Sequence, residues 1–263
     1  MIEVFLASIL LGVFTGLLAG LFGIGGGLVI VPVLVFLFSA QGFPAELVLL
    51  MAVATSLATI ILTAISSVLA HHRLASVVWP KVFRLSPGII AGAAAGAVIA
   101  KQISTDNLRL ALVIFLVYVA LQMALQIKPK PGAVKQSRAS DYTVACIIGM
   151  LSSIVGIGGG SLTVPYLVHG QMPMRNAVAV ASACGLPIAV AGTLSYALLG
   201  WNALHLPDWS LGYVYLPAFL GIGLSSIFTA PIGAKLAHKL PAQKLKRYFS
   251  LLLFVMAAKL LLH

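Results

Sequence analysis

Two glycine clusters are the residues in this chain whose type and spacing could do chemistry. The first is Gly23-Ile-Gly-Gly-Gly27, the second is Gly156-Ile-Gly-Gly-Gly160, and each is followed by a short run that ends in proline. Consecutive glycines let the backbone turn sharply and leave its amides uncovered. If a helix begins directly after each cluster, its free N–H groups and the positive end of its dipole suit an anion. The clusters therefore predict an anion site built largely from backbone.

Hydroxyl side chains extend this predicted site. Thr55 and Ser56 begin a stripe of Ser and Thr on one helical face that continues through Thr59 and Thr63. Such a stripe either lines a water-filled pathway or bonds back to the carbonyls of its own helix, and the sequence leaves both interpretations open. The segment 179–183 repeats the pattern of 52–56, which adds Ser182. The predicted substrate-binding residues are Gly25, Gly26, Gly27, Thr55, Ser56, Gly158, Gly159, Gly160, Ser161 and Ser182.

Close helix packing is the alternative explanation for glycine in an apolar segment, because small residues let two helices approach each other. Two series of glycines spaced by four residues fit packing better than binding: Gly12, Gly16 and Gly20, and Gly88, Gly92 and Gly96. Three consecutive glycines exceed what packing needs, so we interpret the two clusters as binding elements.

The composition places these residues in a membrane. Hydrophobic residues make up 61% of the 263 residues, charged residues only 8%, and the mean hydropathy is +1.11. A soluble domain carries about 25% charged residues. The net charge of +11 does not indicate nucleic-acid binding, because 13 of the 16 Lys and Arg fall in short connections between apolar stretches.

The positions of the acidic residues argue against several other classes of membrane protein. All five lie near the ends of apolar stretches or in connections, whereas cation transporters and proton pumps usually need a buried carboxylate. The chain also lacks a His-Glu-x-x-His motif and any metal-ligand spacing of its two cysteines. We therefore expect no enzyme activity, no metal and no cofactor. An intramembrane enzyme remains a remote alternative, and a channel or cation permease a second one.

Eight apolar stretches predict an all-α polytopic membrane protein. They cover roughly 4–39, 45–70, 85–101, 106–127, 142–169, 176–200, 212–234 and 243–262. A single span needs about 20 apolar residues, but the first and fifth stretches contain the glycine clusters and are predicted to fold back as broken hairpins. The expected division is a first transmembrane repeat at 1–127, a basic cytoplasmic linker at 128–141 and a second repeat at 142–263.

The basic residues predict how the two repeats are oriented. Eight simple crossings would divide Lys and Arg equally between the two sides of the membrane. If the two glycine-containing stretches instead return to the side they entered, connections 71–84, 128–141, 170–176 and 235–247 become cytoplasmic, with 13 basic residues inside and 3 outside. Both termini are then external, and the repeats have inverted topology. Whether each hairpin is re-entrant or a pair of short spans stays open.

The duplicated motif resembles the TauE/SafE sulfite exporter family of bacterial membrane permeases. The resemblance lies in Leu21-Phe-Gly-Ile-Gly-Gly-Gly27, Val155-Gly-Ile-Gly-Gly-Gly160, Ala54-Thr-Ser56, the basic linker, and Gly233-Ala-Lys-Leu-Ala237 with Leu240-Pro241. It implies a multi-pass protein of the inner (plasma) membrane that carries small sulfur-containing anions such as sulfite or organosulfonates. The sequence departs from the expected Thr-Ser pair at Ala181-Ser-Ala183. The particular anion, its direction of transport, any coupling ion and the oligomeric state are left open.

Overall fold

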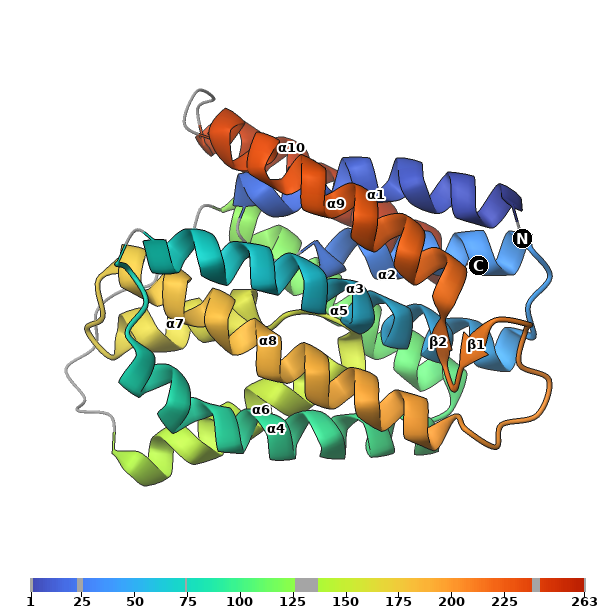
Figure 1. Ribbon diagram of the computed structural model, residues 1–263, viewed down its shortest axis with the longest axis horizontal. Coiled ribbons are helices and arrows are strands. Elements are labelled where there is room, and N and C mark those ends of the chain that lie inside the picture. Colours follow the sequence, from blue (N-terminus) through green and yellow to red (C-terminus); the bar gives the residue numbers. More distant parts are fainter. Residues whose placement is uncertain (1, 23–25, 74, 126–136, 238–241, 263) are drawn as a thin grey trace.

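The computed structural model describes residues 2–22, 26–73, 75–125, 137–237 and 242–262 (Figure 1). The first half contains α1 (Ile2–Phe22), α2 (Gly27–Ala40), α3 (Ala45–Arg73), α4 (Trp79–Gln102) and α5 (Thr105–Ala124). The second half contains α6 (Arg138–Val155), α7 (Gly160–His169), α8 (Met174–Leu199), the two-residue strands β1 (Ser210–Leu211) and β2 (Val214–Tyr215), α9 (Leu216–Ala237) and α10 (Ala242–Leu262). The expected all-α class is confirmed, with one small antiparallel hairpin added.

Both glycine-containing stretches are broken helices, as the sequence predicts. The first divides into α1 and α2, and the second into α6 and α7. Helix α2 begins after Gly26, which has a φ of 75°, and α7 begins after Gly159, which has a φ of 71°. Side chains disfavour this left-handed backbone, so glycine is needed at both breaks. Helix α7 has only 10 residues, roughly half of what a single span needs.

Several of the other helices are long enough to cross a bilayer. Among the described residues, four helices meet that requirement by length and apolar composition: α3, α4, α5 and α8. Helix α3 is the most buried of the four and packs against both α8 and α9. Helix α5 packs against α10, its counterpart in the other half. The core therefore mixes helices from the two halves.

The largest helix–helix interfaces also join the two halves. Helix α1 packs against α9, and α6 packs against α4. If α1 corresponds to α6 and α4 to α9, the two interfaces are equivalent. In each, the first helix of one half packs against the fourth helix of the other half.

Both interfaces use the glycine series that the sequence assigned to packing. A methyl group at Gly16 would lie 2.7 Å from Cα of Ser226 in α9, and one at Gly88 would lie 2.6 Å from the Tyr142 carbonyl oxygen of α6. Methyl groups at Gly12, Gly92 and Gly96 would meet the backbone of the same partner helices. The packing prediction is confirmed for these glycines, while the surroundings of Gly20 lie outside the described part of the structure.

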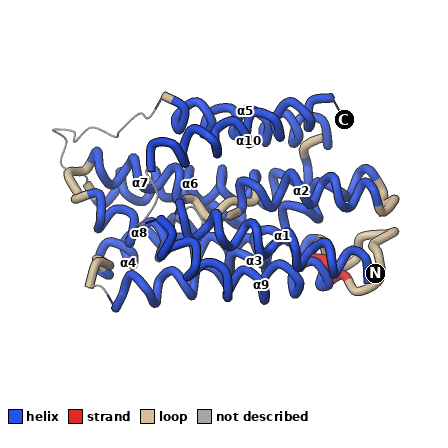
Figure 2. The backbone as a smooth tube through the Cα atoms, turned by 90° about the horizontal axis from the view of Figure 1, so that it is seen from above, coloured by secondary structure: helices blue, strands red, loops and turns tan. Residues whose placement is uncertain are grey.

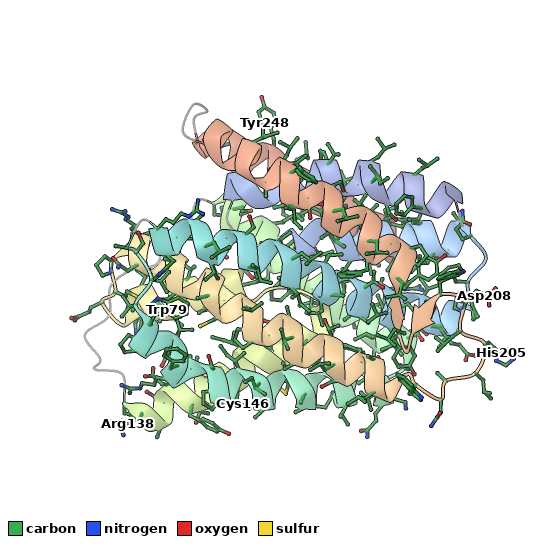
Figure 3. All side chains as sticks on the ribbon, in the orientation of Figure 1. Trp79, Arg138, Cys146, His205, Asp208 and Tyr248 are labelled. Atoms are coloured by element: carbon green, nitrogen blue, oxygen red, sulfur yellow. The ribbon has the colours of Figure 1, made fainter. Side chains whose placement is uncertain are left out.

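The ends of the helices fall into two groups at opposite ends of the molecule (Figures 1 and 2). Both termini lie at one end, together with the last turns of α2, α4 and α8 and the strands. Helices α4, α6, α8 and α10 begin at the other end. Figure 3 shows Trp79 and Arg138 at this second end and His205 and Asp208 at the first. The connections rich in Lys and Arg therefore join helix ends at this second end of the molecule.

Helix α6 begins a few residues before position 142, where the second repeat is expected to start. Residues 126–136 of the expected linker lie outside the described residues, and α6 already begins at Arg138. Ser137 caps this helix through a reciprocal pair of hydrogen bonds with Ser140. The last residues of the expected linker are thus the first turn of α6. The apolar pattern did not reveal this turn because it is polar.

Candidate functional site

The two glycine breaks lie against each other. A methyl group on Gly27 would be 2.7 Å from the Gly156 carbonyl oxygen and 3.1 Å from Cα of Ile157. Ile60 of α3 contacts both breaks, because its side chain lies 3.0 Å from the methyl position of Gly27 and 3.3 Å from that of Gly158. The start of α2 and the turn before α7 therefore meet in the interior of the protein.

The first turn of α7 presents amides that no other group uses. The Gly159 carbonyl accepts hydrogen bonds from Leu162 and Thr163. No side chain caps α7, and among the described residues the N–H groups of Gly160 and Ser161 donate no hydrogen bond. The arrangement at α2 is similar where it is described, since Gly26 accepts from Val29 and Ile30. Gly25 of the predicted site lies outside the described residues.

Buried hydroxyl groups surround this turn without partners. The side-chain oxygens of Ser152, Ser161, Thr163 and Ser182 are buried and form no hydrogen bond among the described residues. Ser152 Oγ lies 3.1 Å from the methyl position of Gly159, next to the start of α7. Ser182 lies one turn before Gly185, whose methyl position is 3.1 Å from the Gly158 carbonyl oxygen. The hydroxyls thus belong to the three helices that meet at this break.

An unpartnered buried hydroxyl is costly, because it has lost its hydrogen bonds to water and gained none in exchange. The cost is about 1–3 kcal/mol for each group. Four such oxygens on the three helices at this break, together with two open amides, are groups that can donate hydrogen bonds. A small anion could accept several hydrogen bonds there at once. The arrangement can bind a negative charge without a cationic side chain.

Thr55 and Ser56 hold this region together. Ser56 Oγ donates to the Gly156 carbonyl oxygen at 2.8 Å, which ties α3 to the break between α6 and α7. Thr55 Oγ1 accepts a hydrogen bond from the backbone N–H of Tyr215 at 3.0 Å. Both residues are fully buried. The structure therefore brings them to the predicted place, but it engages both hydroxyls with backbone groups.

Thr59 and Thr63, which continue the hydroxyl stripe, follow the back-bonding interpretation. Thr59 donates to the Ser56 carbonyl oxygen at 2.7 Å and Thr63 donates to that of Ile60 at 3.2 Å. These bonds run back to the same helix. In this conformation neither hydroxyl lines a water-filled pathway.

Sequence reasoning missed Ser152 and Thr163. Both are Ser or Thr in apolar segments, and only the folded structure shows that their hydroxyls lack partners near the break. Ser152 precedes the second glycine cluster by one turn and Thr163 follows it by one turn. This symmetric spacing around Gly156–Gly160 was the one available signal in the sequence.

Sequence reasoning also placed Asp141 near the end of an apolar stretch but did not predict its burial. Asp141 is fully buried in α6 and accepts hydrogen bonds from Lys81 Nζ of α4 at 2.8 Å and from the Tyr166 hydroxyl of α7 at 2.6 Å. Arg84 forms a second ion pair with the same carboxylate. The cluster joins α4, α6 and α7. It is a buried ion network at the far end of the short helix α7.

The described residues contain no group of three or more His, Cys, Asp or Glu that could hold a metal ion. Cys146 and Cys184 are free. The polar groups of the candidate site are therefore backbone amides and side-chain hydroxyls.

Comparison with known proteins gives consistent matches over almost the whole chain. Residues 8–260 match the family described as Sulfite exporter TauE/SafE. A probable membrane transporter protein from Haemophilus influenzae is 38% identical over 98% of this chain and 98% of its own length. Similar proteins of the same description occur in Methanocaldococcus jannaschii, at 28% identity over 97% of this chain and 94% of that one, and in Bacillus subtilis, at 26% over 98% and 97%.

Proposed function

The chain belongs to the sulfite exporter TauE/SafE family of membrane transporters, and we propose that it carries small sulfur-containing anions such as sulfite or organosulfonates across the inner (plasma) membrane. The substrate binds between the two glycine-broken segments, near the middle of the bilayer. The residues that bind it are the glycines of both breaks together with Ser152, Ser161, Thr163 and Ser182. Thr55 and Ser56 position the breaks.

The proposed architecture is a pair of inverted repeats, residues 1–127 and 142–263, separated by a basic cytoplasmic linker. The same order of one broken hairpin and three helices recurs in both halves. The reciprocal packing of α1 on α9 and of α4 on α6 supports a two-fold relation between them. Helix α7 is too short to cross the bilayer, which favours a re-entrant second hairpin. Both termini are then external.

The observation that carries the proposed substrate class is the set of unpartnered hydroxyls around open helix amides. A polar group that faces no water and no partner inside a membrane protein costs several kcal/mol. An oxyanion has several acceptor oxygens and can satisfy several such donors together. Backbone amides repel a cation because they can only donate, and the one buried carboxylate among the described residues, that of Asp141, is already paired with Lys81 and Arg84. The site therefore favours anions over cations.

Another small anion is the second candidate, because amides and hydroxyls recognise negative charge before they recognise sulfur. A thermal-shift screen of the purified protein separates these cases. Sulfite, thiosulfate, taurine and sulfoacetate should raise the melting temperature, while chloride, nitrate and divalent cations at matched ionic strength should not. Flux of the best anion into proteoliposomes then tests transport. Stabilisation by divalent cations alone would overturn the proposal, and stabilisation by chloride or nitrate alone would reassign the substrate.

A further inference from the structure

A second anion site is indicated by three basic residues that the orientation rule leaves outside the cytoplasmic connections. These residues are Lys101, Arg109 and Lys259. Lys101 has a structural role, because its Nζ donates to the Leu199 carbonyl oxygen at 3.0 Å and so caps the end of α8. The other two converge on one cavity. The orientation rule therefore does not explain the positions of Arg109 and Lys259.

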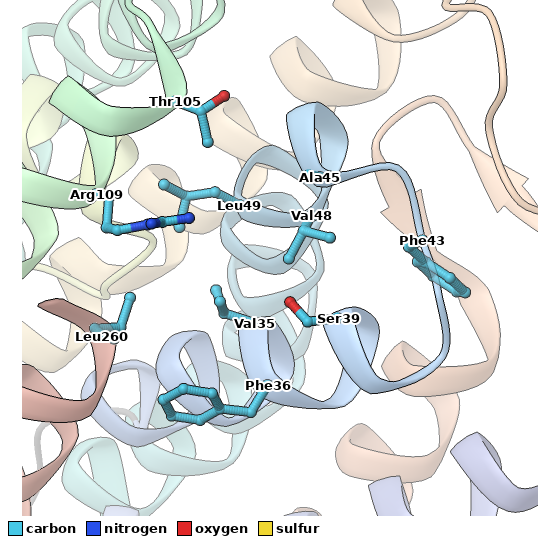
Figure 4. Close-up of a pocket in the computed structure, with 10 residues that line it drawn as sticks. All are labelled: Val35, Phe36, Ser39, Phe43, Ala45, Val48, Leu49, Thr105, Arg109 and Leu260. Carbon is cyan, nitrogen blue, oxygen red and sulfur yellow. The ribbon is translucent and has the colours of Figure 1, made fainter. Parts of the chain in front are cut away.

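The cavity has a volume of about 230 Å³ and lies between α2, α3, α5 and α10 (Figure 4). Arg109 extends from α5 toward Leu49 of α3, with Thr105 on the same helix. Most of the other lining side chains are apolar, including Val35, Val48 and Leu260. On the rim, Lys259 Nζ lies 4.5 Å from the ring centre of Phe36, which also lines the cavity. The cavity thus combines positive charge with apolar walls.

Arg109 is half-buried, and no ion pair or hydrogen bond of its side chain occurs among the described residues. The acids nearest to it along the chain and at the same end, Asp106 and Glu46, are exposed and form no ion pair with it there. A partly desolvated charge gains from an ion-pair partner. A guanidinium in this position has the fork of donors that suits a carboxylate, sulfonate or phosphate.

We propose that this cavity binds a small amphiphilic anion, with its acid group on Arg109 and Thr105 and its short apolar chain against Val35, Val48 and Leu49. The volume lies below the roughly 300–1,000 Å³ of sites for drug-sized ligands, so a short-chain sulfonate or carboxylate fits whole. The cavity lies at the opposite end of α2 from the glycine break. It is a separate site, and binding there does not require the central site to be correctly assigned.

Titration of the purified full-length protein in a neutral detergent with methanesulfonate and pentanesulfonate tests this proposal. Each buried CH₂ should tighten binding by about fourfold, so pentanesulfonate should bind more than tenfold more tightly than methanesulfonate. Arg109→Gln should weaken pentanesulfonate binding at least tenfold, Arg109→Lys should restore part of it, and the matched control Lys101→Gln should leave it unchanged. Melting temperatures of all three variants establish that they fold.

Two further arms separate this site from its alternatives. Ser161→Ala should not change the Arg109-dependent component of pentanesulfonate binding, and Arg109→Gln should not change sulfite affinity, so failure of one site is distinguishable from failure of the other. Nanodiscs of phosphatidylglycerol and of phosphatidylcholine test a lipid phosphate as the source of the acid group. The proposal is overturned if Arg109→Gln binds pentanesulfonate like the parent, or if the length of the alkyl chain has no effect on affinity. It is also overturned if phosphatidylglycerol is the only ligand that binds in an Arg109-dependent way.

Discussion

At the scale of single residues, the main finding is that the hydroxyls near the glycine breaks have two different roles. Thr55 and Ser56 form hydrogen bonds with backbone groups of distant segments, whereas Ser152, Ser161, Thr163 and Ser182 have no partner among the described residues. Ser56 ties α3 to the break between α6 and α7, and Thr55 ties α3 to β2. The second group is available to a ligand.

Ser56→Ala tests the structural role. It removes the donor to the buried Gly156 carbonyl oxygen, so the protein should lose about 1–3 kcal/mol of stability and melt at a lower temperature. Ser226→Ala is the matched control, because that buried hydroxyl bonds only to Gly223 of its own helix. Equal melting temperatures of Ser56→Ala and Ser226→Ala would show that the tie between α3 and the break is unimportant.

At the scale of helices, close glycine contacts create the interfaces between the two halves. Gly92 illustrates this, because a methyl group there would overlap the backbone of Cys146 in α6. Helix propensity alone favours Ala over Gly by about 1 kcal/mol. Gly92→Ala should nevertheless lower the melting temperature, since α4 and α6 must separate. Ala95→Leu, at an exposed position of α4, should not, and a more stable Gly92→Ala protein would contradict the described interface.

The buried carboxylate of Asp141 gives a second prediction at this scale. Asp141→Asn leaves Lys81, which is 12% exposed, and Arg84 without their counter-charge. Removing one partner of a buried ion pair costs about 3–5 kcal/mol, so thermal stability should fall sharply. Adding Lys81→Met should recover part of the loss, whereas Glu46→Gln at an exposed position should change little. A mild effect of Asp141→Asn would mean that water reaches the cluster.

At the scale of the whole molecule, the topology can be tested with accessible cysteines. In a variant with Cys146 and Cys184 replaced by alanine, Asn202→Cys should react with a membrane-impermeant maleimide in intact cells. Ala139→Cys should react only after permeabilisation. Both positions are exposed and lie at opposite ends of the molecule. Labelling of Ala139→Cys in intact cells would reverse or remove the proposed orientation.

How much the sequence predicts depends on the kind of interaction. The eight apolar stretches, the two breaks and the packing role of Gly88 follow from hydrophobicity and glycine spacing. Such patterns are local, so they can be recognised without a fold. The burial of Asp141 and the partners of Thr55 depend on contacts between distant segments. Polar residues at helix ends look alike in sequence whether they are solvated or paired inside the protein.

The central claim, that an anion binds at the glycine breaks, is tested most directly by calorimetric titration of sulfite or the best anion from the screen. The parent protein, Ser161→Ala and the control Ser226→Ala are compared under one set of conditions. The Ser161 hydroxyl has no partner in the described structure, so its removal should not lower the melting temperature. It should weaken anion binding about tenfold, as expected for one hydrogen bond to a charge. Ser226→Ala should bind like the parent. Unchanged affinity in a well-folded Ser161→Ala protein would contradict the proposed site.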